Sequence, residues 1–262
     1  MAGWLLWYAL TGTLAGMLAG LMGVGGGLVI VPSLLFAFTW QDVDPRYLAH
    51  LAVGSSLAAI IPISFSSLWS HQRRGAIRWP VVRRLTPGLM LGAWSGAWLA
   101  GQMDSGGLRM LFGAFLLLVA MQMFSGFRPG SARTDGGRGL YALWGGLIGL
   151  VSGLVGIGGG TMTVPLLAWR GVSLPRAVAT SAACGLPIAL AGAAGFLYFG
   201  ARSQPSLTTG YVHGLAVTVI SLFAVATAPL GARWAHSLPV PLLRRFFAVV
   251  LLVVGVRLLV NI

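Results

Sequence analysis

Residues 149–165 read GLVSGLVGIGGGTMTVP and lie inside an apolar run much longer than an ordinary globular helix. A related stretch occurs earlier, where residues 16–32 read GMLAGLMGVGGGLVIVP. When the two stretches are aligned from Gly16 and Gly149, every glycine of the first meets a glycine of the second, and Pro32 meets Pro165. Two copies of a glycine-broken apolar segment are typical of transporters, where such breaks mark the substrate site.

The composition places the chain in a lipid bilayer. Of its 262 residues, 57% are hydrophobic and 8% are charged, whereas a soluble domain carries about 25% charged residues. Apolar runs close to the ~20 residues that a membrane helix needs recur along the chain. We therefore expect an all-α integral membrane protein with about eight apolar segments, whose approximate ranges are 3–38, 47–69, 79–103, 108–126, 140–169, 174–200, 207–232 and 240–262.

The net charge of +13 is made by arginine, because the chain contains no lysine and no glutamate. Basic proteins often bind nucleic acid, but here the arginines lie in short loops between apolar runs, where positive charge orients a membrane protein. We expect no nucleic-acid partner and a multi-pass protein of the cell inner membrane. The single cysteine, Cys184, excludes an internal disulfide and a multi-cysteine metal site.

The chain divides into two similar halves. Residues 128–139 are polar and rich in turn residues, as a connecting loop would be. The glycine stretch repeats on either side of this loop, and so does a polar pair, because Val53-Gly-Ser-Ser aligns with Val178-Ala-Thr-Ser at an offset of 125 residues. We expect residues 1–127 and 140–262 to be two transmembrane copies of one unit.

The first and fifth apolar runs are too long for one crossing. A straight helix over residues 3–38 would extend ~54 Å, whereas the hydrocarbon core is only ~30 Å thick. If each glycine break turns its run into a hairpin, the halves become inverted repeats. Thirteen arginines then lie on one face, and four, Arg46, Arg109, Arg202 and Arg257, lie on the other. If each long run instead crosses the membrane once, the repeats are parallel, and ten arginines lie on one face and seven on the other. The stronger positive-inside bias favours inverted repeats with both termini outside.

The glycine breaks are the main candidates for substrate binding. Consecutive glycines can stop a helix within the membrane, and the helix that restarts presents free N–H groups and a positive dipole end, which bind anions. Thr161 and Thr163 would add hydroxyl donors to the second break. The alternative is a structural kink that only permits close packing. The break residues with this proposed role are Gly23, Gly25, Gly26, Gly27, Gly156, Gly158, Gly159 and Gly160.

Ser55, Ser56, Thr180 and Ser181 are the other repeated polar residues inside apolar runs. A hydroxyl in a membrane helix usually bonds to a carbonyl of its own helix, but one that faces a cavity could donate to an oxyanion. The two interpretations weigh about equally. The glycines that recur every fourth residue before each break more simply serve helix packing.

Other kinds of site find little support. The four aspartates all lie in predicted loops, whereas cation and proton transporters usually carry a carboxylate within the membrane. His50 and His213 remain as candidate proton carriers. A Rossmann fingerprint is excluded because Ile30 stands where the third glycine is required, and a Walker motif lacks its lysine. We expect no enzyme activity, no cofactor and no metal site.

Together, the paired Gly-x-Gly-Gly-Gly-x-x-x-x-Pro segments at 23–32 and 156–165 and the Val53-Gly-Ser-Ser and Ala179-Thr-Ser segments resemble the sulfite exporter TauE/SafE family over essentially the whole chain. The resemblance implies two homologous halves and the export of sulfite or an organosulfonate such as sulfoacetate. It carries the family motif onto the break glycines, Pro32, Pro165 and the four hydroxyl residues. The proposed role of Thr161 and Thr163 rests on the chemistry of the break alone and not on the resemblance.

We therefore expect a transporter that exports a small sulfur-containing anion by alternating access. The anion would lie near the midplane between the two breaks. One alternative is a transporter of a different small anion or of a metal cation. The other is a membrane anchor or assembly subunit without transport of its own, in which the breaks would tolerate substitution.

Overall fold

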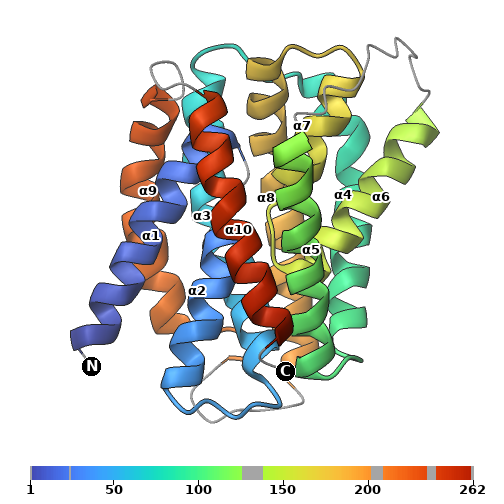
Figure 1. The fold of residues 1–262 in the computed structure, drawn as a ribbon. Coiled ribbons are helices and arrows are strands. Elements are labelled where there is room, and N and C mark those ends of the chain that lie inside the picture. The colour runs from blue at the N-terminus through green and yellow to red at the C-terminus, as the bar shows by residue number, and fades with distance from the viewer. Residues whose placement is uncertain (1, 24, 126–137, 202–208, 235–239, 261–262) are drawn as a thin grey trace.

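The computed structural model describes residues 2–23, 25–125, 138–201, 209–234 and 240–260. In these parts the chain forms α-helices and no β-strand beyond an isolated bridge between Thr209 and Val212 (Figure 1). The helices are α1 (Ala2–Met22), α2 (Gly27–Trp40), α3 (Leu48–Gln72), α4 (Trp79–Ala100), α5 (Ser105–Ser125), α6 (Arg138–Val155), α7 (Gly160–Trp169), α8 (Leu174–Gly200), α9 (Gly214–Trp234) and α10 (Val240–Val260). The expected all-α class is confirmed, and most of the connecting loop 128–139 lies outside the described residues.

Several of these helices are built to cross a membrane. Among the described residues, five helices, α1, α3, α5, α8 and α9, are long and apolar enough to span it. Shorter apolar helices accompany them, α2 and α6 among them. Most side chains that face outward from the bundle are large and apolar, as in Leu6, Leu91 and Leu222, which are 73%, 71% and 69% exposed. Such a surface suits lipid and not water.

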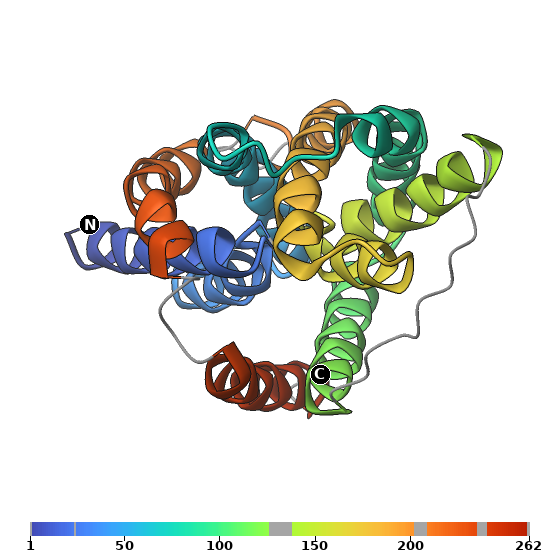
Figure 2. The ribbon, with the colours of Figure 1, turned by 90° about the horizontal axis from the view of Figure 1, so that it is seen from above.

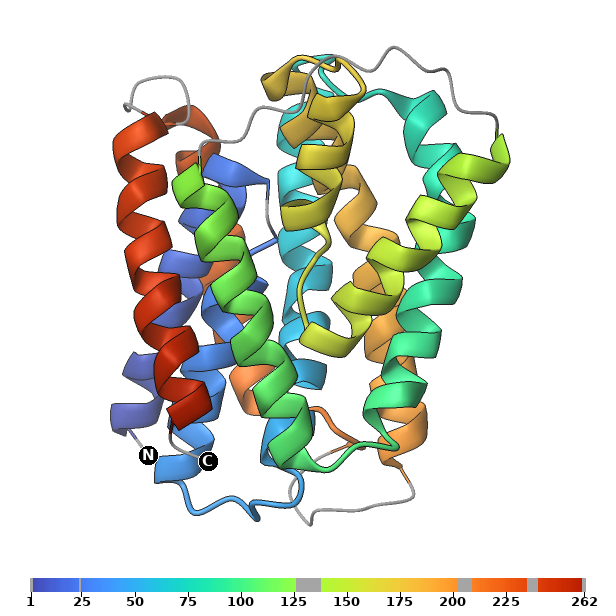
Figure 3. The same ribbon diagram turned by 45° about the vertical axis from the view of Figure 1, so that its right-hand side comes forward.

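Each of the two long apolar runs is broken into a helical hairpin, as the sequence predicts. In the first run α1 ends at Met22 and α2 begins at Gly27. In the second run α6 ends at Val155 and α7 begins at Gly160. In Figures 1 and 3, the hairpin of α1 and α2 enters and leaves at the lower end of the molecule. The hairpin of α6 and α7 enters and leaves at the upper end. The described helices therefore form eight segments, two of which are hairpins.

The remaining segments run the length of the bundle. Figure 1 shows α3 rising and α4 descending in the first half, and α8 descending and α9 rising in the second. Both described ends of the chain lie at the lower end. The loop between α3 and α4 lies at the upper end, and so does the turn between α7 and α8. Seen from above, α3 and α8 lie between the α1–α9 pair and the α4–α6 pair, while α5 and α10 pair at one side (Figure 2).

Each hairpin packs mainly against a helix of the other half: α1 lies along α9, and α6 lies along α4. The glycines before the breaks form these contacts. A methyl group at Gly12 or Gly16 would overlap the backbone of α9, and one at Gly145 or Gly149 would overlap that of α4. Small residues allow this close approach of two backbones in a membrane. The packing role that the sequence favours for these glycines is what the structure shows.

Candidate functional site

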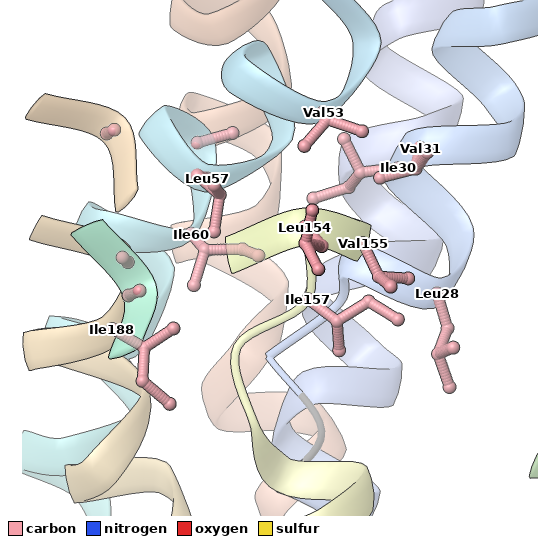
Figure 4. Close-up of a cluster of buried hydrophobic side chains, with 14 of the residues drawn as sticks. Leu28, Ile30, Val31, Val53, Leu57, Ile60, Leu154, Val155, Ile157 and Ile188 are labelled. Carbon is pink, nitrogen blue, oxygen red and sulfur yellow. The ribbon is translucent and has the colours of Figure 1, made fainter. Parts of the chain in front are cut away.

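The two glycine breaks meet in the middle of the bundle. A methyl group added to Gly25 would lie 3.1 Å from Gly158 Cα, and one added to Gly27 would lie 2.5 Å from the Gly156 carbonyl oxygen. The second distance is shorter than real Cβ contacts, and the first is tighter than most of them. Figure 4 shows the apolar residues around this crossing, among them Ile60, Ile157 and Ile188. Backbone thus lies directly against backbone where the hairpins cross, and no side chain separates them.

The breaks have matching backbone geometry. Gly26 precedes α2 with φ of 76°, and Gly159 precedes α7 with φ of 71°. This left-handed conformation is costly for residues with a Cβ, so glycine is needed at both positions. Ile30 N–H donates to Gly26 O, and Thr163 N–H donates to Gly159 O. The N–H groups that come before those of Ile30 and Thr163 in α2 and α7 precede the first full helical turn. Together with the positive end of the helix dipole, they make each break favourable for negative charge.

Serines of each half bind the break of the other half. Ser56 on α3 donates a hydrogen bond to Gly156 O at 2.8 Å. Ser181, its counterpart on α8, donates to Gly23 O at 3.1 Å and shares this hydroxyl with Val178 O. Both serines are fully buried. These bonds satisfy carbonyl groups that the breaks free from helical bonding, which a membrane interior otherwise leaves unpaired.

The neighbouring hydroxyls hold the start of a helix in the opposite half. Ser55 Oγ accepts from His213 N–H at 2.8 Å, just before α9. Thr180 Oγ1 accepts from Arg78 N–H at 3.1 Å, just before α4, and donates to Arg176 O on its own helix. Thr180 thus makes the bond to its own helix that one interpretation from the sequence gives, and the role of these hydroxyls in substrate binding stays a prediction. In the described residues, these hydroxyls mainly join the halves, a role for which sequence gives no signal beyond their matching positions.

A small pocket lies beside the crossing, toward the upper end of the bundle. Its volume is about 10 Å³, about enough for one water molecule. Gly25 and Gly158 of the breaks line it, together with Gly23 and Ser181. Ser64 and Ser67 on α3 also line it, and sequence reasoning missed both because they have no hydroxyl counterpart in the second half. The full lining is Ala19, Gly23, Gly25, Ile63, Ser64, Ser67, Gly158, Ser181, Ala182 and Gly185.

Other predicted site residues lie outside this pocket. Thr161 and Thr163 are buried in the first turn of α7, and their hydroxyls have no hydrogen-bond partner among the described residues. They do not line the pocket. Ser55, Ser56 and Thr180 also lie outside its lining, which Ser181 alone of the four paired hydroxyl residues reaches.

His50 and His213 lie at the lower end, away from the pocket. His50 is buried, its Nε2 lies 2.9 Å from Ala100 O, and its ring stacks on Tyr211 at 4.8 Å between centroids. His213 Nδ1 accepts from Ala216 N–H, and its ring packs against Phe38. Burial lowers the pKa of His213, in the loop before α9. Both histidines occupy packing positions, and the proton-carrier role stays a prediction.

The charges at the two ends of the bundle are unequal. None of the described helices contains an aspartate or glutamate, and among the described residues no cluster of histidine, cysteine or acidic side chains could hold a metal ion. The α3–α4 connection at the upper end carries Arg73, Arg74 and Arg78. At the lower end Arg46 pairs with Asp44 at 2.7 Å, which neutralises part of the charge there.

Comparison with known proteins identifies the chain. The family model for the sulfite exporter TauE/SafE matches residues 8–258. A probable membrane transporter protein of Haemophilus influenzae is 35% identical over 95% of both chains. A probable membrane transporter protein of Methanocaldococcus jannaschii is 29% identical over 84% of this chain and 80% of its own. The probable membrane transporter protein YunE of Bacillus subtilis is 28% identical over 95% and 94%. No solved structure matches.

An apolar bundle in which two broken helices meet in the middle has the architecture of a multi-pass membrane transporter. The relatives bear the same description. The chain belongs to the sulfite exporter TauE/SafE family. The expected membrane-embedded, multi-pass protein is thereby confirmed, and a bacterial inner membrane agrees with it.

Proposed function

We propose that this transporter exports a small sulfur oxyanion, sulfite or an organosulfonate, by alternating access. The observation that carries the proposal is the crossing of the two breaks, where Gly25 lies against Gly158, each two residues before a helix begins. The N–H groups and positive dipole ends at this crossing favour an anion. Membership of the sulfite exporter TauE/SafE family supports sulfur as the central atom of that anion.

We further propose that residues 1–127 and 140–262 are inverted repeats and move against each other. The opposed hairpins support this proposal, as do the reciprocal bonds from Ser56 and Ser181 to the opposite breaks. With room for about one water molecule at the crossing, an anion would need the halves to part before it could enter or leave. Rocking of one half against the other supplies that motion.

Membrane potential would drive export. Moving one negative charge outward is favoured by ~2.3 kcal/mol per 100 mV of inside-negative potential. An anion exporter can therefore run without a coupling ion, which agrees with the lack of acidic residues in the described helices. Under the positive-inside rule the arginine-rich upper end would face the cytoplasm.

The test is the flux of labelled sulfite, and then of sulfoacetate, in proteoliposomes with an imposed potential. We expect saturable flux that follows the potential and that is selective against chloride. The double variant Gly26→Leu and Gly159→Leu should lose this flux, with folding checked by size-exclusion chromatography. Because leucine is strained at both positions, the double variant Ser56→Ala and Ser181→Ala serves as a milder second disruption of the crossing.

Three results would contradict the proposal or one part of it. Folded wild-type protein without flux for any sulfur oxyanion would remove the substrate class. Full flux in both double variants would remove the crossing as the site. Flux that required a pH gradient and was lost in His50→Gln or His213→Gln would replace the potential-driven mechanism with proton coupling.

A further inference from the structure

The two halves differ beside the crossing, and two of the differences lie at positions of α8 that line the pocket. At the offset that aligns Ser56 with Ser181, Leu57 and Ile60 on α3 correspond to Ala182 and Gly185 on α8. Ala182 and Gly185 line the pocket. Leu57 and Ile60 are fully buried at the equivalent place on the lower side (Figure 4), and a methyl group at Gly192 would lie 2.9 Å from Leu57. The lower side is therefore filled where the upper side is open.

The pocket holds a hydroxyl group that has no partner. Ser67 is 4% exposed, and its Oγ has no hydrogen-bond partner among the described residues. An unpaired buried hydroxyl costs free energy that a packing role does not explain. Ser64 lies one helical turn earlier, is 3% exposed and faces the same pocket. A methyl group at Gly185 would lie 3.0 Å from Ser64 Oγ and 3.1 Å from Gly158 O, so Gly185 keeps the space between α3 and the break open.

We propose that this pocket, once the halves have parted enough to widen it, is the loading subsite for the oxyanion, in which the Ser67 hydroxyl donates a hydrogen bond to one of its oxygens and Ser64 lines the approach. The inference rests on the proposed function and adds where the substrate first binds. Ser64 and Ser67 lie in the last turns of α3, which ends at Gln72 and is followed by Arg73, Arg74 and Arg78. This charge favours an anion over a cation as the occupant.

The first experiment compares three variants in the flux assay and in the thermal stabilisation of the purified protein by sulfite. Ser67→Ala removes the unpaired donor, and we expect the affinity for sulfite to fall about tenfold or more. Gly185→Ala fills the pocket and should abolish stabilisation by sulfite. Ser66→Ala is the matched control, because this neighbouring hydroxyl donates to Val225 O on α9 instead. Sulfite affinity should stay at the wild-type value in this control.

The second experiment does not depend on transport. Ser67→Cys is made in a Cys184→Ala background and treated with thiosulfonate reagents that carry either a sulfonate or a trimethylammonium group. We expect faster labelling by the sulfonate reagent and protection by methanesulfonate, an unreactive sulfonate. Equal rates for the two reagents, or protection by sodium ions in place of the sulfonate, would overturn an anion subsite here.

The outcomes separate the two proposals. If wild-type protein carries sulfite and the Ser67→Ala and Gly185→Ala variants match Ser66→Ala, the subsite is wrong and the transport function stands. If wild-type protein carries no sulfur oxyanion but Ser67→Cys shows the sulfonate preference and the protection, the anion subsite stands and the substrate changes.

Discussion

Ser56 and Ser181 each satisfy a carbonyl group in the opposite half, and both side chains are fully buried. Removing either hydroxyl leaves a buried acceptor unpaired, which costs about 1–3 kcal/mol. We expect Ser56→Ala and Ser181→Ala each to lower the free energy of unfolding by that amount, measured by thermal or denaturant unfolding in detergent. Thr218→Ala is the control, because Thr218 is exposed and bonds to Gly214 O of its own helix. Equal stability of all three variants would contradict this role.

His213 gives the protein a pH-dependent stability. Its Nδ1 accepts a hydrogen bond from Ala216 N–H, and burial lowers its pKa below the ordinary value of 6.5. Between these two pKa values the unfolded chain binds more protons at this residue than the folded chain does, so stability falls as the pH drops through about 6.5. We expect the unfolding temperature to decrease between pH 7.5 and 5.5, and to decrease less in His213→Gln. An equal decrease in both proteins would assign the effect to other groups.

At the level of helices, the close contact between α4 and α6 depends on the glycine on the face of α6 where an added methyl group would meet α4. A methyl group at Gly149 would overlap the Leu89 carbonyl of α4, whereas one at Gly146 would meet nothing within 4 Å. We expect Gly149→Ala to separate the two helices and lower the unfolding temperature in detergent. Gly146→Ala should be neutral or stabilise by up to about 1 kcal/mol, because alanine favours the helix. Similar effects of the two substitutions would mean that α6 does not use this face.

The same elements show how far sequence reasoning reached. Hydropathy predicted the segments and the glycine runs predicted both hairpins, because each depends only on local composition. The family resemblance and the break chemistry also led to the residues that cross at Gly25 and Gly158. Ser67 was missed, because its lack of a partner is set by how α3 packs against α8 and the break. Thr161 was assigned to the site from its neighbours in sequence; it does not line the pocket, and its role in substrate binding stays a prediction.

For the whole molecule, the arrangement of arginines makes a prediction about orientation. The loop with Arg74 lies at the upper end and the loop with Arg46 lies at the lower end. We expect Arg74→Cys to be labelled only from the cytoplasm and Arg46→Cys only from outside, each in a Cys184→Ala background with an impermeant thiol reagent. Both positions are exposed, so access is not limited by packing. Labelling of both from one side would contradict the crossing of α3, and labelling from the reversed sides would contradict the proposed orientation.

The packing of α1 against α9 also has a consequence for how the chain is made. The residues in contact, such as Gly16 and Ala224, are separated by most of the polypeptide. During synthesis the first hairpin therefore enters the membrane long before its main partner exists. Its glycine-lined face must meanwhile be covered by lipid or by an insertion factor, and a chain that stops before α9 would present this face to quality-control proteases.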